Sequence, residues 1–268
     1  MGLRFKRTQK EERQAKAPII IYGPPRSGTT YLGEIISQHP EVFISNEYRI
    51  FTWLHQSTHV LPDIDDMVLH SRKGFKKFLD KEVPPLIRKF YAQKHPHIKY
   101  WGDKNPFYGG DIGRLRTIAE YFPDTKFINI VRDGRDVVTS LMNKKWADGR
   151  PWADFDTAHQ VWNSNIKNGL EFAKEAKKKN HYLIKYEDLV NDDLNETKKI
   201  FKFLEIDWRK PVEKYCIQQQ KERTIVSKPV RDIRKDASMS LWSEKLTKAE
   251  QTKSLKLLNK NLKLLGYK

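Results

Sequence analysis

The sequence predicts an α/β protein of three layers, in which helices flank a central, mostly parallel sheet. Two observations support this fold class. Short runs of β-branched and apolar residues at 19–21 and 126–131 are each followed by a glycine-containing turn and a helical pattern. Further apolar runs alternate with helical patterns along the chain, as they do in parallel sheets. With 268 residues, we expect a basic arm over 1–16 and one domain with an ample core over 17–268.

The first of these turns has the composition of a phosphate-binding loop. Gly23 and Gly28 stand at the G-x4-G spacing of nucleotide-binding loops, and Ser27 is a further small residue that lets backbone N–H groups approach an anion. The helix that begins near Thr29 directs the positive end of its dipole at the same place. Thr29 occupies the position of the lysine that binds a nucleoside triphosphate, and Arg26 supplies a planar cation instead. We therefore expect a P-loop-like fold that binds a different phosphate donor.

Two further strands should bring polar side chains to the same edge of the sheet. A second strand over 41–47 places Glu47 at a carboxyl end, where it is either a general base or a surface residue that begins the next helix. A third strand over 98–107 carries Lys104 toward the site, unless this lysine is simply solvated. Four histidines are rival bases that do not fall at predicted strand ends: His39, His55, His59 and His70.

The stretch between these strands predicts helices, which include 74–79 and 86–94. Pro84 and Pro85 should separate them, because proline lacks the N–H that a helix interior requires. An insertion at this point is a suitable place for an acceptor-recognition surface. No motif within 50–98 identifies the acceptor.

The second half of the chain completes the layers. A helix that ends before Pro123 leads into the strand 126–131, whose turn and following helix repeat the arrangement of the first anion-binding turn. The expected elements after it are a helix over 152–179 with Trp162 in its core-facing stripe, a strand over 181–185, a helix over 194–207 and a terminal helix over 255–265 ended by Gly266. The terminal helix has a basic opposite face, so it either docks on the domain or lies on a membrane surface.

Two strings of this sequence resemble signatures of one enzyme family. Pro25-Arg26-Ser27-Gly28-Thr29-Thr30-Tyr31-Leu32 resembles the 5′-phosphosulfate-binding loop of sulfotransferases that use 3′-phosphoadenosine 5′-phosphosulfate (PAPS), as in the protein-tyrosine and carbohydrate branches. The segment 132–140 resembles their 3′-phosphate-binding segment, in which Arg132 and Ser140 match the arginine at a strand end and the serine eight residues on. The resemblance implies that the 5′-phosphosulfate is bound by Arg26, Ser27, Gly28, Thr29 and Thr30.

The resemblance also implies catalytic residues. Glu47-Tyr48-Arg49 is similar to the Glu-x-Arg pattern of tyrosylprotein sulfotransferases and lies at the same separation from the loop arginine, which implies that Glu47 is the base. Lys104 resembles the lysine of Lys-Asp-Pro-Phe in these enzymes, with Asn105 in place of the aspartate. The implied role of Lys104 is to neutralise charge that gathers on the sulfuryl group in the transition state.

Two weaker matches concern the rest of the cofactor. Tyr186-Glu187-Asp188 resembles the Tyr-Glu-Asp found after a late strand, which implies that Tyr186 contacts the adenine unless it caps the sheet. Arg234-Lys235-Asp236 resembles the Arg-Lys-Gly loop of cytosolic sulfotransferases, and it implies cofactor binding by Arg234 and Lys235. The aspartate in place of glycine puts the backbone contact of that loop in doubt.

Together these matches imply sulfuryl transfer from PAPS to a hydroxyl or amine acceptor by in-line displacement, without a metal. The product nucleotide would be adenosine 3′,5′-bisphosphate (PAP), and the acceptor would be a small molecule, a glycan or a peptide. Two other functions stay open: a P-loop nucleotide kinase or NTPase, which the missing lysine disfavours, and a basic nucleic-acid-binding module. A thermal-shift comparison of PAP with ATP–Mg²⁺ separates these functions.

Composition adds constraints on partners and location. The 51 basic and 34 acidic residues give 51 − 34 = +17, which favours an anionic ligand, although stretches such as 177–179 are ordinary solvated lysines. Cys216 is the one cysteine, so no internal disulfide forms, and its expected role is that of a small buried side chain. We find no signal peptide and no apolar run long enough to span a membrane, and therefore expect a cytoplasmic protein, although a catalytic fragment of a membrane-anchored parent would give the same pattern.

Overall fold

The computed structural model describes residues 17–59, 66–145, 149, 152–225 and 242–267. Its centre is a five-stranded sheet with the strand order β2-β3-β1-β4-β5, and all four strand pairings are parallel. The strands are β1 (Ile19–Tyr22), β2 (Val42–Asn46), β3 (Tyr100–Lys104), β4 (Lys126–Val131) and β5 (His181–Lys185). The sheet confirms the expected α/β fold.

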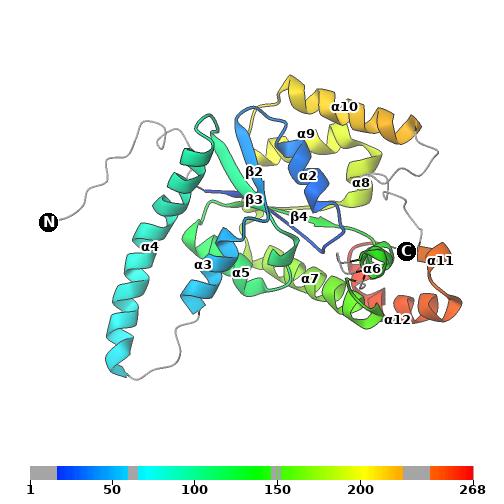
Figure 1. The fold of residues 1–268 in the computed structure, drawn as a ribbon, viewed down its shortest axis with the longest axis horizontal. Coiled ribbons are helices and arrows are strands. Elements are labelled where there is room, and N and C mark those ends of the chain that lie inside the picture. The colour runs from blue at the N-terminus through cyan, green and yellow to red at the C-terminus, as the bar shows by residue number, and fades with distance from the viewer. Residues whose placement is uncertain (1–16, 60–65, 146–148, 150–151, 226–241, 268) are drawn as a thin grey trace.

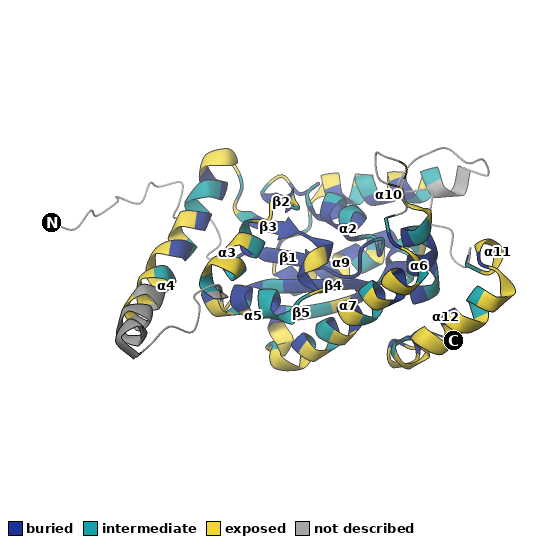
Figure 2. Cartoon of the chain, turned by 60° about the horizontal axis from the view of Figure 1, so that its bottom comes forward, coloured by how far each residue is buried: buried dark blue, intermediate teal, exposed yellow. Residues whose placement is uncertain are grey.

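Helices cover both faces of this sheet, as Figure 1 shows. One face packs against α2 (Thr29–Ile36), α8 (Tyr186–Asn191), α9 (Asp193–Leu204) and α10 (Lys210–Ile225). The other face packs against α3 (Ile50–His59), α4 (Asp66–Lys94), α5 (Ile112–Tyr121) and α7 (Phe155–Glu175). Successive side chains of β1 divide between the two faces, with Ile19 and Ile21 in one core and Ile20 and Tyr22 in the other. The strands are therefore mostly buried on both sides (Figure 2).

A third cluster lies beside β4 and contains α6 (Gly134–Asn143), α7 and α12 (Lys248–Leu264). Leu258, Leu262 and Leu265 of the terminal helix are buried against this cluster, so the helix docks on the domain. Leu255 is 42% exposed and does not share that face. Gly266, with φ +72°, follows the end of the helix as expected. The remaining short elements are the 3₁₀ turns η1 (Pro106–Tyr108) and η2 (Lys178–Asn180) and the helix α11 (Trp242–Lys245).

Helix α4 corrects one expectation, because it runs through Pro84 and Pro85 without a break. Val83 and Ile87, one on each side of the prolines, are both buried in the core, and this packing outweighs the local preference of the prolines. Asp80 and Lys81, whose carbonyls lose their helical donors, are exposed, so water can bond to those carbonyls.

Helix α10 was not expected from the sequence. Its buried residues Val212, Cys216 and Gln219 share one face, and the buried glutamine interrupts the apolar pattern. Cys216 is fully buried, as expected, and burial raises the pKa of its thiol. Among the described helices, none is long and apolar enough to cross a membrane.

Candidate active site

The predicted site residues lie at the carboxyl ends of all five strands. Gly23 follows β1, Glu47 follows β2, Lys104 ends β3, Arg132 follows β4 and Tyr186 follows β5. Strand β1 lies between β3 and β4, so the chain crosses from one half of the sheet to the other at this strand. In parallel sheets ligands bind in the crevice outside such a switch point.

The loop after β1 has a backbone that only glycine permits at two positions. A Cβ at residue 23 would lie 1.9 Å from the carbonyl oxygen of Ile130, because the loop passes directly against β4. Gly28 has φ +87°, and a Cβ there would lie 2.4 Å from Cδ2 of Tyr186. The two glycines thus let the loop pack closely on β4 and on Tyr186.

The N-terminus of α2 presents donors of the kind that bind anions. Gly28 is its N-cap, no side chain caps this end, and no acidic residue lies in its first turn. The first-turn N–H groups have no intrahelical acceptor. The hydroxyl of Ser27 is buried and has no hydrogen-bond partner among the described residues. A phosphate or sulfate oxygen would satisfy both kinds of donor, so these residues fit the phosphosulfate end of a nucleotide.

The two motifs that resemble the donor site are joined by hydrogen bonds. Nε of Arg26 donates to Oγ of Ser140 over 2.9 Å, and a guanidinium nitrogen of Arg132 donates to the carbonyl oxygen of Arg26 over 3.2 Å. The strand ends of β1 and β4, more than 100 residues apart in sequence, therefore present their arginines to one location.

Arg132 is only 6% exposed and is fixed from several sides. Its guanidinium lies over the ring of Tyr186 at 4.8 Å, and it is 4.0 Å from the carboxylate of Asp136. The indole of Trp162 donates to its carbonyl oxygen over 3.1 Å. Tyr186 is itself 6% exposed, and its ring packs in the core and lies against Arg132 and Gly28. The adenine contact of Tyr186 stays a prediction.

Glu47 and Lys104 form a pair at the other side of the loop. Nζ of Lys104 donates to Oε1 of Glu47 over 2.8 Å, and the amide of Glu47 donates to the carbonyl oxygen of Lys104 over 2.9 Å. The lysine side chain is 3% exposed and that of Glu47 is 36% exposed. A Cβ at residue 33 would lie 3.6 Å from Cβ of Lys104, an ordinary contact distance, so the lysine stem lies against α2.

Sequence reasoning missed the residues that hold Arg132 and α6 in place. The side chain of Asp133 caps α6 by accepting from the amide of Arg135 over 2.9 Å. One oxygen of Glu187 accepts from the amide of Asp133 over 2.9 Å, and the other accepts from the hydroxyl of Tyr267 over 2.8 Å. Asp133 could have been predicted as a helix N-cap, because an aspartate directly before a helix is typical of that position. The contact of Glu187 with Tyr267 has no signal in the local sequence.

Two of the rival histidines have partners elsewhere in the fold. His39 is buried and bonds through Nδ1 to the amide of Glu41, and His55 contacts Thr117 and Asp111. No group of three or more metal-ligating side chains occurs among the residues that the structure describes. Arg234 and Lys235 lie outside the described residues.

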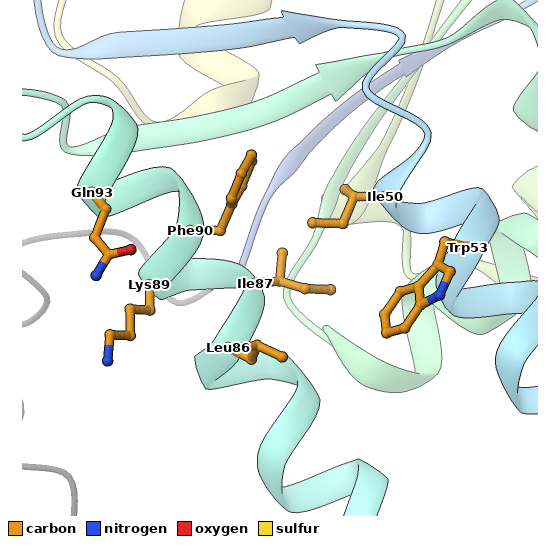
Figure 3. A pocket seen from close by; sticks show the side chains of 7 residues that line it. All are labelled: Ile50, Trp53, Leu86, Ile87, Lys89, Phe90 and Gln93. Atoms are coloured by element: carbon orange, nitrogen blue, oxygen red, sulfur yellow. The ribbon is translucent and has the colours of Figure 1, made fainter.

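An apolar pocket of about 470 Å³ lies between α3 and α4, next in sequence to the Glu47 turn. Figure 3 shows its lining, which is Ile50 and Trp53 from α3 and Leu86, Ile87, Lys89, Phe90 and Gln93 from α4. Trp53 and Leu86 are 52% and 59% exposed. The ring centroids of Tyr48 and Phe90 are 6.2 Å apart. Tyr48, which directly follows Glu47, therefore lies beside the pocket.

The sheet order, the glycine loop and the paired arginines define an α/β protein of the P-loop-like class with an arginine after each of two neighbouring strands. Residues 18–210 match the model of the sulfotransferase family, and the chain belongs to that family.

Three known proteins illustrate the similarity. The protein-tyrosine sulfotransferase of Drosophila melanogaster is 27% identical over 197 residues, which are 72% of this chain and 39% of that enzyme. The sulfotransferase domain from the curacin biosynthetic pathway has a TM-score of 0.59 at 18% identity, with 95% of this chain and 99% of that chain covered. A mouse sulfotransferase solved in complex with PAP has a TM-score of 0.56 at 15% identity, with 94% and 86% covered. The two solved structures share the fold, and the chain spans well under half the length of the fly enzyme.

Proposed function

We propose that this protein transfers the sulfuryl group of PAPS to a hydroxyl group of an acceptor. The acceptor oxygen forms a bond to sulfur, the bond from sulfur to the 5′-phosphate breaks, the hydroxyl proton leaves, and PAP is released. Membership of the sulfotransferase family supports this activity. The names of the protein-tyrosine relatives and the PAP held by the mouse neighbour agree with it.

The observation that carries the proposal is the bonding of Arg26 to Ser140 and of Arg132 to the backbone of Arg26. One ligand with phosphates at two positions would meet both strand ends. Arg26, the hydroxyl of Ser27 and the first amides of α2, which include those of Thr29 and Thr30, would hold the 5′-phosphosulfate. Arg132 and Ser140 would hold the 3′-phosphate through charge-assisted hydrogen bonds.

Glu47 and Lys104 have complementary roles in the proposed reaction. Glu47 is half-exposed, so an acceptor hydroxyl can approach its carboxylate and give up its proton there. An ammonium group carries three N–H donors, and Glu47 uses one donor of Lys104. The other two remain to stabilise negative charge on the transferred group.

A thermal-shift measurement tests the donor. PAP should raise the melting temperature, since a ligand at 100 times its Kd stabilises a fold by about 2.7 kcal/mol. ATP–Mg²⁺ and an oligonucleotide at the same concentration are the comparisons. A shift with ATP–Mg²⁺ alone would favour a kinase, and salt-dependent binding of the oligonucleotide alone would favour a nucleic-acid-binding module.

Arg132→Ala should weaken PAP binding about tenfold or more, because a charge-assisted hydrogen bond to phosphate contributes roughly 1.5–3 kcal/mol. Titration calorimetry measures this change. Arg116→Ala is a matched control, since Arg116 pairs with Glu171 and Glu175 on the outer helices. Equal PAP affinity in the two variants would remove Arg132 from the donor site.

For the acceptor, we propose a tyrosine in a peptide, with an apolar neighbour of that tyrosine seated in the pocket between α3 and α4. Leu86→Asp should then raise KM for a tyrosyl peptide with a leucine or phenylalanine beside the tyrosine by about tenfold, since a buried apolar side chain contributes about 1.5–3 kcal/mol. Phe78→Asp is the control, because Phe78 is a similarly exposed apolar residue of α4 that does not line the pocket. An equal KM in both variants would exclude the pocket as the acceptor site.

The cytoplasmic location of the protein stays a prediction.

A further inference from the structure

Asp103 is a fully buried carboxylate that directly precedes Lys104. Neighbouring residues of a strand point to opposite faces, so Asp103 faces away from the lysine stem and toward α4 and η1. Its Oδ1 accepts from the hydroxyl of Ser45, which also lies 2.8 Å from the hydroxyl of Tyr91. Its Oδ2 accepts from the hydroxyl of Tyr108 over 2.5 Å.

The remaining contact of Asp103 is with the backbone of the Glu47 turn. The amide of Tyr48 donates to Oδ1 over 3.2 Å. Tyr48 lies between Glu47 and Arg49, whose backbones are both left-handed, with φ +60° and φ +58° respectively. Non-glycine residues hold that conformation only where surrounding contacts impose it. Two hydrogen bonds hold this turn: the one from the Tyr48 amide to Asp103, and the one from the Glu47 amide to the carbonyl oxygen of Lys104.

We propose that Asp103 is a positioning residue whose carboxylate holds the amide of Tyr48 and thereby keeps Glu47 on Lys104 during sulfuryl transfer. The inference rests on the proposed function. A neutral side chain of the same shape would fill this site equally well, so packing alone does not call for a carboxylate there. A hydrogen bond from an amide to a charged acceptor is stronger than one to a neutral acceptor. The charge of Asp103 therefore strengthens the hydrogen bond that holds the turn.

The protonation state of Asp103 changes within the physiological range. Burial raises its pKa to about 6, although the bonds from Ser45, Tyr108 and Tyr48 and the charge of Lys104 lower it. The titratable groups that face it are Tyr91 of α4 and Tyr108 of η1, and the charge of Lys104 acts on it from the opposite side of the strand. With a pKa of about 6, a growing fraction of the carboxyl groups is neutral as the pH falls through that value, so the hydrogen bond to the Tyr48 amide weakens.

Hydrogen exchange tests this contact without any assumption about activity. In Asp103→Asn at pH 7.5, the protection factor of the Tyr48 amide should fall about tenfold, and that of the Asn105 amide, which bonds to Ile21 within the sheet, should not change. Ser254→Ala is the control variant, because it removes another buried hydrogen bond, to His159, far from the turn. That variant should leave the Tyr48 amide unchanged.

Turnover of PAPS with a tyrosyl peptide gives the second measurement. Asp103→Asn should lower kcat about threefold to tenfold with the Kd for PAP unchanged, and its kcat should lack the step near pH 6 that we expect for the wild type. Tyr108→Phe should move that step to higher pH, since the Tyr108 hydroxyl lowers the pKa of Asp103. Unchanged Tyr48 protection, or lost protection with wild-type kcat, would overturn the role of Asp103. A wild type that binds no PAP and transfers no sulfuryl group would instead refute the proposed function.

Discussion

Glu47→Gln is expected to lower kcat for sulfuryl transfer by about 10²- to 10⁴-fold, which is the range that a positioned base contributes. The amide oxygen of glutamine can still accept from Nζ of Lys104, so the 2.8 Å contact and the turn should persist. What the variant loses is the basic oxygen that receives the proton of the acceptor. The Kd for PAP should therefore stay at its wild-type value, and a combined measurement of kcat and of PAP binding separates the two effects.

A matched control exists on an outer helix. Glu171 is 46% exposed and paired with Arg116, which resembles the partly exposed, cation-paired state of Glu47. Glu171→Gln should leave kcat unchanged. Wild-type turnover in Glu47→Gln would show that another group, or water, takes the proton.

Lys104→Met is expected to lower kcat by about 10²- to 10³-fold, the effect of removing one donor that is preorganised for a developing negative charge. Methionine is flexible and fills a similar volume, so the buried stem against α2 should remain packed. Glu47, at 36% exposure, can be hydrated when it loses its partner. The fold should therefore persist while turnover falls, and circular dichroism with steady-state kinetics measures both.

Lys126 provides the comparison for this variant. It begins β4, at the amino ends of the strands and so opposite the candidate site, and it pairs with Glu205 over 2.7 Å. The variant therefore breaks a similar lysine–glutamate pair outside the candidate site. Lys126→Met should leave kcat unchanged. A similar loss in both variants would mean that the effect comes from the stability of the sheet, and Lys104 would lose its proposed role.

Residues at strand ends could be predicted from the sequence because their signals are local. An apolar run followed by Gly23 and Gly28 locates the loop, and similar runs locate Glu47 and Arg132 at the same edge. Asp103 could not be found in this way. Its hydrogen-bond partners come from positions 45, 48 and 108, and only the folded chain brings them together.

The helices show the same division between local and distant causes. Pro84 and Pro85 give a strong local signal for a break, yet burial of Val83 and Ile87 keeps α4 continuous. In α10 the buried Gln219 hides the helical period, which the packing of Val212 and Cys216 reveals. Propensity therefore predicted elements whose core face is apolar and failed where tertiary contacts decide.

The two ends of the donor crevice are supported by different parts of the chain. The loop at 23–28 is held by β4 and Tyr186, whereas the turn after β4 is braced through Glu187 by Tyr267, beyond the terminal helix. Terminal helices open locally more readily than central strands. Transient fraying of α12 would therefore loosen the turn that holds Arg132 before it affects the loop around Ser27. If the donor binds as we propose, selectivity for a nucleotide with both a 3′- and a 5′-phosphate would then depend on how firmly the terminal helix is docked.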